Sequence, residues 1–299
     1  MKLSRNFPLN GMRVFEAAAR HLSFTKAGEE LGMTQTAVSY QIKLLEEILG
    51  EQLFLRRPRQ VTLTEAGASL APRVSEALGL LQEAVANLRE TAQVTLTIHS
   101  TATFAQQWLA RRIGDFQIRH PNIAVRLETS SSVIDFNSTE ADIAIRSGNG
   151  TWPGLHCQFL MRGDFTPMLS PTLAQSVGGI HRPEDLLRLR IIDPGDPWWR
   201  IWFSAAGIDD PDLESRPRSR LGAQSFEANA AIAGQGVGIL TPTFYRNEVA
   251  MGLLFQPFDI LGSDGRGYWL VYPEGKRKLP KIKAFHAWIV ETLATDDLR

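Results

Sequence analysis

The sequence predicts a small all-α module with a two-stranded wing at the N-terminus, one long linking helix, and a C-terminal α/β domain. Three observations predict this order. Apolar residues recur at helical spacing through the first 50 residues, a 3.5-residue apolar repeat follows over 71–88, and strand-like and helix-like segments alternate from residue 94 onward. The chain of 299 residues is also too long for one ordinary compact domain.

Composition narrows the class of protein. Hydrophobic residues make up 43% of the chain and charged residues 21%, and the net charge is zero, which excludes a disordered chain and a uniformly basic one. The single cysteine, Cys157, excludes an internal disulfide framework and fits a reducing compartment. Because no signal-peptide pattern and no apolar run of about 20 residues occurs, we expect a cytoplasmic protein that does not span a membrane.

Two short helices open the chain. The first, over 9–22, is predicted by an apolar face that consists of Met12, Phe15, Ala19 and Leu22. Ser23 is expected to cap the second helix and Gly32 to end it. The apolar face of this second helix consists of Phe24, Ala27 and Leu31. Two helices around a short turn with glycine are typical of a helix-turn-helix.

The third helix carries two faces. Thr34 is its predicted N-cap and Gly50 its end, and Ala37 stands where a capping box needs Glu or Gln. One face is an apolar stripe of Val38, Ile42, Leu45 and Leu49. The other is polar and consists of Thr36, Ser39, Tyr40 and Lys43, with Gln35 beside it. Such side chains near the start of the second helix of the motif are placed to reach base edges in the major groove, and a solvated helix face is the alternative.

A basic wing is predicted to follow. Segments 53–55 and 61–63 read as two short strands around a turn that contains Arg56, Arg57 and Arg59, which suit phosphate or minor-groove contacts. Residues 1–64 contain nine Lys and Arg residues and six Asp and Glu residues, which gives a net charge of +3. The modest positive charge is therefore concentrated at the wing.

Residues 64–90 predict one long helix capped by Thr64. Its apolar residues are spaced alternately by three and four: Ala71, Val74, Leu78, Leu81, Val85 and Leu88. This repeat favours pairing with a second helix as a coiled coil, and burial against the chain's own second domain is the alternative. A dimer with two DNA-binding modules implies an operator with two half-sites and a roughly palindromic sequence.

Up to this point the chain resembles the LysR-type transcription regulators, and within them the glycine-cleavage and β-lactamase regulator branch. The resemblance rests on FEAAAR at 15–20, SFTKAG at 23–28, TQTAVSYQIKLLE at 34–46, LFLRR at 53–57 and LTEAG at 63–67. It implies DNA contacts by Ser23, Thr25, Thr34, Gln35, Thr36, Ser39, Tyr40, Lys43, Arg56, Arg57 and Arg59. Tyr40 departs from the pattern, because many members carry Arg or a smaller polar residue there. A tyrosine can donate to a phosphate or stack on a sugar.

The remaining residues predict an α/β sheet. Alternating strands are expected over 94–98 and 123–127, with a helix from Phe104 to Arg119 between them, and 142–146 reads as a buried strand that ends in Arg146. Further units are expected at 169, 173–177, 186–192, 198–206, 226–233, 237–240, 268–272 and 282–293. Strands that alternate with helices are typical of an α/β sheet.

The resemblance continues through this half. DIAIRSG at 142–148, WWRIWF at 198–203, AAIAGQG at 230–236 and YWLVYP at 268–273 resemble the effector domain of the same branch. This implies a fold similar to type 2 periplasmic binding proteins, in which two α/β subdomains flank a cleft, with chain crossings near 161–165 and 264–268. The expected organisation is a DNA-binding domain at 1–64, a linker and dimerisation helix at 65–90, and an effector domain at 91–299. Subdomain I is expected at 91–163 and 268–299, and subdomain II at 164–267.

A candidate effector site follows from this architecture, because ligands bind at the carboxyl ends of strands, where helix N-termini offer free N–H groups to anions. The candidates are Ser100, Thr101, Thr103, Ser130, Ser131, Arg146, Gln224, Ser225 and Tyr268. The resemblance favours Thr103, Arg146, Ser225 and Tyr268 among them. Simple helix capping is the alternative for each hydroxyl, and a structural ion pair with an acidic neighbour is the alternative for Arg146.

Other chemistry is weakly supported. The six histidines lack metal-ligand spacing, and Cys157 reads as a small packing residue, so we expect no metal, no cofactor and no catalytic residue. Gly234, Gly236 and Gly238 do not stand between a strand and a helix start, which argues against a dinucleotide loop. A cluster at helical spacing is expected to pack in the core rather than line a ligand: Trp198, Trp199, Trp202 and Phe203.

The leading interpretation is a ligand-responsive, DNA-binding transcription regulator that is not an enzyme. Its expected partners are double-stranded operator DNA, a small carboxylate or amino-acid-like anion as effector, RNA polymerase, and further copies of the chain in a homodimer or homotetramer. A solute-binding protein is the second interpretation, but it predicts a signal peptide and no N-terminal helical module. An enzyme is the third, but it needs converging acid, base or nucleophilic groups.

Overall fold

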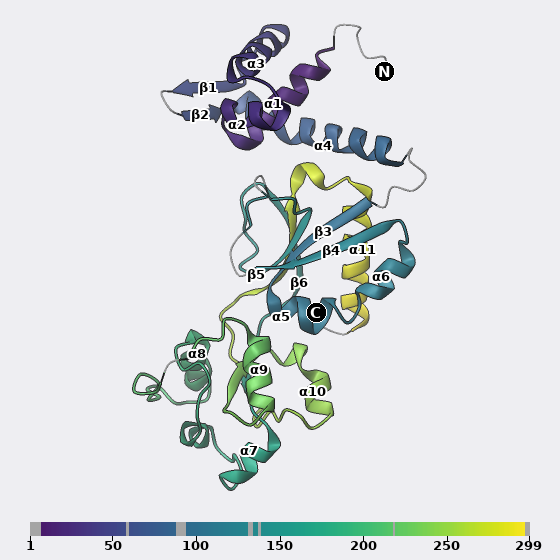
Figure 1. Cartoon of the computed structure of the whole chain (residues 1–299). Helices are drawn as coiled ribbons and strands as arrows, with labels where there is room; N and C mark the ends of the chain where they lie inside the picture. The colour runs from purple at the N-terminus through teal and green to yellow at the C-terminus, as the bar shows by residue number, and fades with distance from the viewer. Residues whose placement is uncertain are drawn as a thin grey trace.

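The computed structural model describes residues 7–57, 60–87, 94–130, 134–136, 139–217 and 219–296. Figure 1 shows three tiers. A helical head lies at one end, a sheet with covering helices in the middle, and a smaller α/β unit at the other end. Helix α4 runs between the head and the sheet. Subdomain I is the sheet with its helices, and subdomain II is the unit from β7 to α10.

Three helices form the head, with the predicted caps. They are α1 Leu9–His21, α2 Phe24–Leu31 and α3 Gln35–Leu49. The Ser23 hydroxyl accepts a hydrogen bond from Lys26 N at 3.3 Å, and the Thr34 hydroxyl accepts one from Ala37 N at 3.2 Å. Gly32 and Gly50 end α2 and α3 in the left-handed region, with φ of +66° and +71°.

Apolar faces of these helices meet in one core. Phe15 and Phe24 pack edge-on against Phe54 with ring centroids 5.6 and 5.3 Å apart. The predicted stripe of α3 is confirmed for Val38, Ile42 and Leu45, which are buried. It is wrong for Leu49, which is 39% exposed because the last residue of α3 extends past the helices that cover the stripe.

The wing is a hairpin of the antiparallel strands β1 Phe54–Arg57 and β2 Gln60–Leu63. The predicted turn residue Arg59 lies outside the described residues. Glu46 joins the hairpin to α3, because its Oε1 accepts hydrogen bonds from the backbone N–H groups of Leu53 at 2.8 Å and Phe54 at 3.2 Å. The position of the wing is thereby coupled to the predicted reading helix.

Helix α4, Glu65–Asn87, begins at the predicted cap, where the Thr64 hydroxyl accepts a hydrogen bond from Gly67 N at 3.0 Å. The first half of its apolar repeat is buried within the chain: Val74 belongs to the head core, and Ala71 and Leu78 pack beside it. Val74 is therefore covered within the chain, whereas Ala71 and Leu78 are only half-buried, and pairing through this helix stays a prediction. Leu81 is 53% exposed.

Subdomain I is built on a mixed five-stranded sheet of order β4-β3-β5-β9-β6. Its strands are β3 Val94–Ser100, β4 Ile123–Thr129, β5 Ile143–Gly148, β6 Leu155–Arg162 and β9 Gly267–Pro273. Strands β4, β3 and β5 run parallel, whereas β9 runs antiparallel to both β5 and β6. Helix α11, Pro280–Thr295, packs on the sheet through buried Phe285, Trp288 and Ile289.

The predicted continuous helix from Phe104 to Arg119 is wrong. The segment consists of α5 Ala102–Phe104, a π-helical turn η1 Ala105–Leu109 and α6 Ile113–Arg119. The π turn is closed by Ala110 N donating to Ala105 O at 2.8 Å, which inserts one residue and lets Phe104, Trp108 and Leu109 all face the core. Apolar spacing does not reveal such an insertion, because the residue types remain those of a helix.

Subdomain II contains a short antiparallel pair, β7 Thr166–Met168 and β8 Gly238–Leu240. Around it lie α7 Pro171–Ser176, the 3-10 turns η2 Pro183–Arg188 and η3 Pro242–Phe244, and the helices α8 Pro197–Ala205, α9 Gln224–Ile232 and α10 Arg246–Ala250. Trp199, Trp202 and Phe203 are fully buried, as predicted for core residues. The chain leaves subdomain I after β6 and returns to it at β9. These two strands are neighbours in the sheet, so the two crossings lie side by side, and Gly163 N donates to Arg266 O at 3.2 Å between them.

In the described part of the chain, no helix has the length and apolarity that a membrane crossing requires.

We expect Gly67→Ala to destabilise the head. A Cβ at this position of α4 would overlap the backbone carbonyl oxygen of Leu53, so α4 or the wing must move, at a free-energy change of about 1–3 kcal/mol. Thermal unfolding of the full chain measures it. Gly114→Ala is the control, because its Cβ meets nothing within 4 Å in α6, and helix propensity predicts a gain of about 0.5–1 kcal/mol there. Equal unfolding temperatures for both variants would contradict the predicted close approach.

Candidate DNA-reading surface and effector site

The start of α3 presents an exposed polar surface. Gln35, Thr36, Tyr40 and Lys43 are exposed on it, and Tyr40 is 64% exposed. Lys43 Nζ lies 3.8 Å from a carboxylate oxygen of Glu47, one turn further on the same helix. Hydrogen-bonding side chains therefore project from the N-terminal half of the helix, as base readout in the major groove requires.

The other predicted DNA-contacting residues differ in their surroundings. Ser23 and Thr34 use their hydroxyls as helix caps, Thr25 is exposed on α2, and Ser39 is half-buried. Arg56 and Arg57 lie on β1, but their side chains are outside the described structure. Ser23 and Thr34 thus already have a local structural role.

Two predicted effector segments come together at the carboxyl ends of β3, β4 and β5. Ser130 N donates to Ser100 O at 3.0 Å, and Thr101 N donates to Ile145 O at 3.3 Å. Ser100 is the last residue of β3 rather than a residue beyond it, and its hydroxyl donates to Thr101 O at 3.1 Å. Ser131 lies outside the described residues.

The subdomains meet directly at this edge. The Thr103 hydroxyl on α5 of subdomain I accepts a hydrogen bond of 3.3 Å from the backbone N–H of Ser225 on α9 of subdomain II. Gln224 adds a second link, because its amide donates to the Tyr268 hydroxyl at 3.5 Å while its Oε1 accepts from Thr241 N at 2.8 Å. Residues 103, 224, 225 and 268 are therefore brought together by the fold.

This geometry argues against helix capping as the role of three of the candidate hydroxyls. Gln224 and Ser225 do not precede the helix: they are its first two residues, after Ala223. Thr101, at the start of α5, makes no side-chain cap hydrogen bond, and Thr103 accepts from the helix of the other subdomain instead of its own. Local capping is therefore not the role of Thr101, Thr103 or Ser225.

Arg146 lies in the middle of β5, rather than at its end, and is only 6% exposed. Its Nη1 donates to Ser130 O at 2.8 Å, whereas its Nε and Nη2 are buried without a hydrogen-bond partner. Burial lowers the pKa of its guanidinium, and no described carboxylate offsets this effect. The alternative of a structural ion pair with an acidic neighbour is therefore wrong, and a buried cation is left with free donors.

Further contacts hold the subdomains together beside the junction. Arg111, just beyond the π turn of subdomain I, forms an ion pair of 2.6 Å with Glu248 on α10 of subdomain II. Arg246, also on α10, donates to the backbone oxygen of Asp296 at 3.3 Å. Contacts on α5 and α10 thus keep the two subdomains close in this structure.

Sequence reasoning missed one buried ionisable group, in the first turn of α9. Glu227 on α9 is 5% exposed, its Oε2 has no partner, and burial together with the negative charges of Asp196 and Asp193 raises its pKa to about 8. The buried hydroxyls of Thr241 and Tyr245 nearby in the fold also lack partners. A signal was present, because Glu227 is the only charged residue between Arg220 and Arg246 in the sequence.

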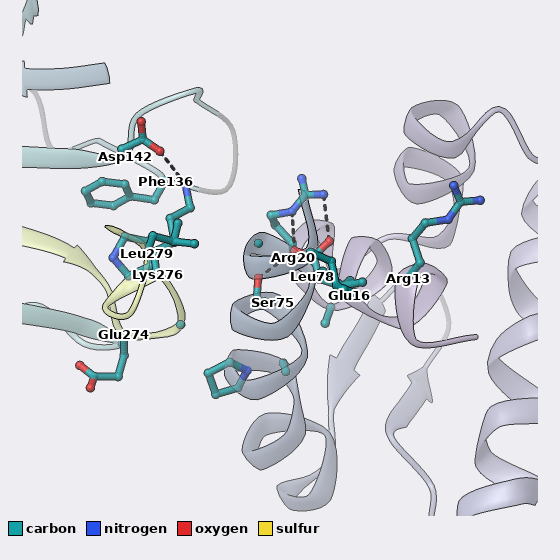
Figure 2. A pocket seen from close by; sticks show the side chains of 18 of the residues that line it. Arg13, Glu16, Arg20, Ser75, Leu78, Phe136, Asp142, Glu274, Lys276 and Leu279 are labelled. Carbon is teal, nitrogen blue, oxygen red and sulfur yellow. Dashed lines mark hydrogen bonds and ion pairs between the residues drawn. The ribbon is translucent and has the colours of Figure 1, made fainter. Parts of the chain in front are cut away.

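A cavity of about 880 Å³ lies elsewhere, between the head with α4 and the end of subdomain I (Figure 2). Ion pairs within the protein neutralise several of the charged groups on its walls. Arg20 pairs with Glu16 at 3.0 Å and Glu30 at 2.6 Å, and Lys281 pairs with Asp142 at 2.6 Å. The side chains described on its walls therefore differ from Arg146 and Glu227, which have buried polar atoms without hydrogen-bond partners.

Comparisons with known proteins agree with this architecture. Residues 9–68 match the model of the bacterial regulatory helix-turn-helix proteins of the LysR family, and residues 89–294 match that of the LysR substrate binding domain. The Escherichia coli (strain K12) glycine cleavage system transcriptional activator is 36% identical over 97% of this chain and 95% of its own. The chain belongs to the LysR family. The transcriptional activator AmpR of Pseudomonas aeruginosa is also 36% identical, with 97% of each chain covered.

Solved structures extend the likeness to three dimensions. Full-length CrgA of Neisseria meningitidis, a LysR-type transcriptional regulator, has a TM-score of 0.59 and 26% identity, over 98% of this chain and 99% of its own. A Citrobacter freundii effector binding domain with three substitutions has a TM-score of 0.61 and 25% identity, over 67% of this chain and 100% of its own. Those substitutions exchange a threonine for valine, a serine for alanine and a tyrosine for phenylalanine, in this order.

The LysR-type regulator is thus a DNA-binding transcription regulator with a helix-turn-helix and an effector-binding domain, as predicted. The relatives are transcriptional regulators, which excludes the interpretations as an enzyme and as a solute-binding protein. In the part of the chain that the structure describes, no three His, Cys, Asp or Glu side chains are grouped to hold a metal ion. Cys157 is half-buried on β6.

The raised pKa of Glu227 predicts a pH dependence of stability. The folded state holds this proton more tightly than the unfolded state, so the contribution of Glu227 is full below its ordinary pKa near 4.5 and is lost as pH rises to about 8. Relative to Glu227→Gln, the natural chain should therefore lose up to about 1.4 kcal/mol per pH unit over this window. Urea unfolding at pH 5, 6, 7 and 8 measures the difference, and Glu184→Gln, at an exposed position, is the control. A constant difference from pH 5 to 8 would contradict the raised pKa.

Proposed function

We propose that this regulator reads its operator through the start of α3 and the wing. Gln35, Thr36, Ser39 and Tyr40 would meet the major groove, because Gln bonds adenine in a bidentate way and hydroxyls bond several base edges. Arg56, Arg57 and Arg59 of the wing, together with Thr25 and Lys43, would contact the phosphate backbone or the minor groove. Ser23 and Thr34 would approach the DNA through helix ends that they cap.

We further propose that a small-molecule effector binds where α5 and α9 meet. The observation that carries this proposal is the buried Arg146, with two donor atoms that no protein group accepts from. A buried charge is normally paired, so an anionic group of the effector is the expected partner. Ser100, Thr101, Thr103, Ser130, Ser131, Gln224, Ser225 and Tyr268 would line the site. The threonine, serine and tyrosine substituted in the C. freundii domain follow the same order as Thr103, Ser225 and Tyr268 here.

Assembly and partners complete the proposal. Regulation would take place in the cytoplasm. Copies of the chain would form homodimers or homotetramers through 65–90 and the effector domains. This assembly would place two heads on two half-sites of the DNA. The functional units would be 1–64, 65–90 and 91–299, the last divided into 91–163 with 268–299 and 164–267. RNA polymerase would be the partner at the promoter. Effector binding would favour one arrangement of the subdomains and so change the spacing of the heads and the bend of the DNA.

The DNA proposal is tested by gel shift on the intergenic region beside the gene. Gln35→Ala and Ser39→Ala should weaken specific binding tenfold or more while changing non-specific binding little, because each base contact contributes about 1–3 kcal/mol. Arg56→Ala should weaken both and flatten the dependence on salt concentration. No binding by the natural chain at low salt, or equal losses on both DNAs for Gln35→Ala, would contradict this assignment.

The effector proposal is tested by Ser225→Ala. Because the Ser225 hydroxyl is buried without a partner, we expect the unfolding temperature to stay the same or rise slightly, whereas the affinity for an effector should fall about tenfold through loss of one hydrogen bond. Thermal-shift screening of a metabolite panel against the full chain identifies ligands, and titration calorimetry measures the affinities of both chains. Full affinity in Ser225→Ala would place the effector elsewhere.

A further inference from the structure

One face of α4 contacts the effector domain, at the turn η4 Glu274–Lys276 and the residues that follow it. Pro72, Glu76 and Gly79 are spaced by four and three residues, which places them on one side of the helix. A Cβ on Gly275 of the turn would lie 2.7 Å from Pro72 O, so the two backbones are in direct contact. Lys278 Nζ lies 2.7 Å from a carboxylate oxygen of Glu76, whose side chain is only 20% exposed.

A glycine on each side permits this close approach. The three heavy atoms nearest to a Cβ on Gly275 all belong to Pro72 of α4, and a Cβ on Gly79 would lie 3.2 Å from the side chain of Leu279. Neither glycine has a positive φ, so the space between α4 and the turn, and not the backbone conformation, favours glycine here. A side chain at position 275 would therefore push α4 away without straining the turn itself.

The contact is narrow, because the cavity of about 880 Å³ lies beside it. Ser75 and Leu78 of α4 line one side of this cavity, and Lys276 and Leu279 line the other (Figure 2). Domains of one chain that share a small and incompletely packed interface are expected to move relative to each other. The contact between α4 and η4 can therefore open without separating a large packed surface.

The turn is held by the two central strands of the sheet that carry proposed effector ligands. Strand β9, which contains Tyr268, leads directly into η4. Lys276 Nζ donates to Ala141 O at 3.1 Å and lies 4.0 Å from a carboxylate oxygen of Asp142. These two residues directly precede β5, which contains Arg146. The position of the turn therefore depends on both strands.

We propose that η4 and Lys278 form a latch that holds α4, and with it the head, against subdomain I, and that an effector changes DNA binding by strengthening this hold. The second half rests on the proposed effector site. A ligand that ties Arg146 and Tyr268 to subdomain II restrains β5 and β9, so the turn keeps the geometry that α4 needs. A latched head has a fixed position relative to the effector domain, whereas a released head is free to reorient.

Carbodiimide cross-linking of the full chain tests the latch directly, because this reagent joins a carboxylate to an amine when the two groups are in contact. We expect a cross-link between Glu76 and Lys278, identified by mass spectrometry of the digested protein. In a mixture of isotope-labelled and unlabelled chains, both halves of the cross-linked peptide pair should carry the same label. Absence of the cross-link, or a pair with mixed labels, would overturn a latch within one chain.

Gly275→Ala should weaken the latch while keeping both reactive groups. Because its Cβ overlaps Pro72 O, the yield of the cross-link should fall at least threefold. Gly114→Ala is the control and should leave the yield unchanged, because its Cβ meets nothing within 4 Å. The oligomeric state should stay the same in both variants, because the residues exposed on another face of α4 are untouched: Arg73, Ala77 and Leu80. Equal yields in the two variants would contradict the latch.

The coupling to DNA is measured with the compounds of the metabolite panel that raise the unfolding temperature. Each should raise the yield of the cross-link at least twofold and change the affinity for the intergenic DNA in gel shifts. Lys278→Glu places two carboxylates opposite each other, so this variant should still bind the compound in calorimetry but lose the change in DNA affinity. Exchange of both charges, in Glu76→Lys with Lys278→Glu, should restore that change.

The outcomes separate the latch from the proposed effector site. A compound that binds more weakly to Ser225→Ala but leaves the cross-link yield of the natural chain unchanged would overturn the coupling and support the site. Equal affinity for the natural chain and Ser225→Ala would overturn the site and, with it, the coupling, while the cross-link would still support the latch. A full DNA response in Lys278→Glu, or none in the chain with exchanged charges, would overturn the latch as the route to DNA binding.

Discussion

Burial of Arg146 without a protein counter-charge is the constraint on which the effector half depends. Such burial makes the meeting of the subdomains less favourable, by an amount that can reach several kcal/mol after relaxation. The Thr103–Ser225 hydrogen bond and the Arg111–Glu248 ion pair act in the opposite direction and hold the subdomains together. The contacts between the subdomains favour their association, whereas the unpaired guanidinium of Arg146 opposes it. A ligand that pairs with Arg146 would therefore favour the associated arrangement.

A strand and a packed turn connect the meeting point of the subdomains to α4. Strand β9 runs from Gly267, next to the proposed site, to Pro273, and the turn Glu274–Lys276 follows at once. That turn packs on α4: a Cβ on Gly275 would lie 2.7 Å from Pro72 O, and Lys278 pairs with Glu76 at 2.7 Å. The end of β9 and α4 are therefore in direct contact through this turn. The cavity of Figure 2 lies beside this contact.

Within the head, one carboxylate joins α3 to the wing. Glu46 on α3 accepts from two backbone N–H groups at the entry to the wing, at 2.8 and 3.2 Å. Charge-assisted hydrogen bonds of this kind are stronger than neutral ones. These bonds fix the proposed reading helix, α3, against the entry to the wing, and Gly67 lets α4 approach the same segment closely.

The local sequence determined much of this protein. The caps Ser23, Thr34 and Thr64 and the glycine stops at Gly32 and Gly50 were predictable, because capping depends on a residue and its close neighbours. Strand and core positions such as Ile143 and Trp202 were predictable from apolar patterns, and ordered motifs indicated the family. The grouping of Thr103, Ser225 and Tyr268 was anticipated through resemblance, and their role as ligands stays a prediction.

Tertiary structure alone decided the rest, because burial and pairing join residues that are far apart in the chain. The π turn at Ala105–Leu109 replaced a regular helix so that three apolar side chains reach one core. Val74 was assigned to the head and not to a partner helix by the position of α1. The isolation of Glu227 among uncharged residues was visible in the sequence, but only its burial and the convergence of Asp193 and Asp196 on it raised its pKa. The sequence determines which groups are present, whereas the electrostatic meaning of a group depends on neighbours that only the fold supplies.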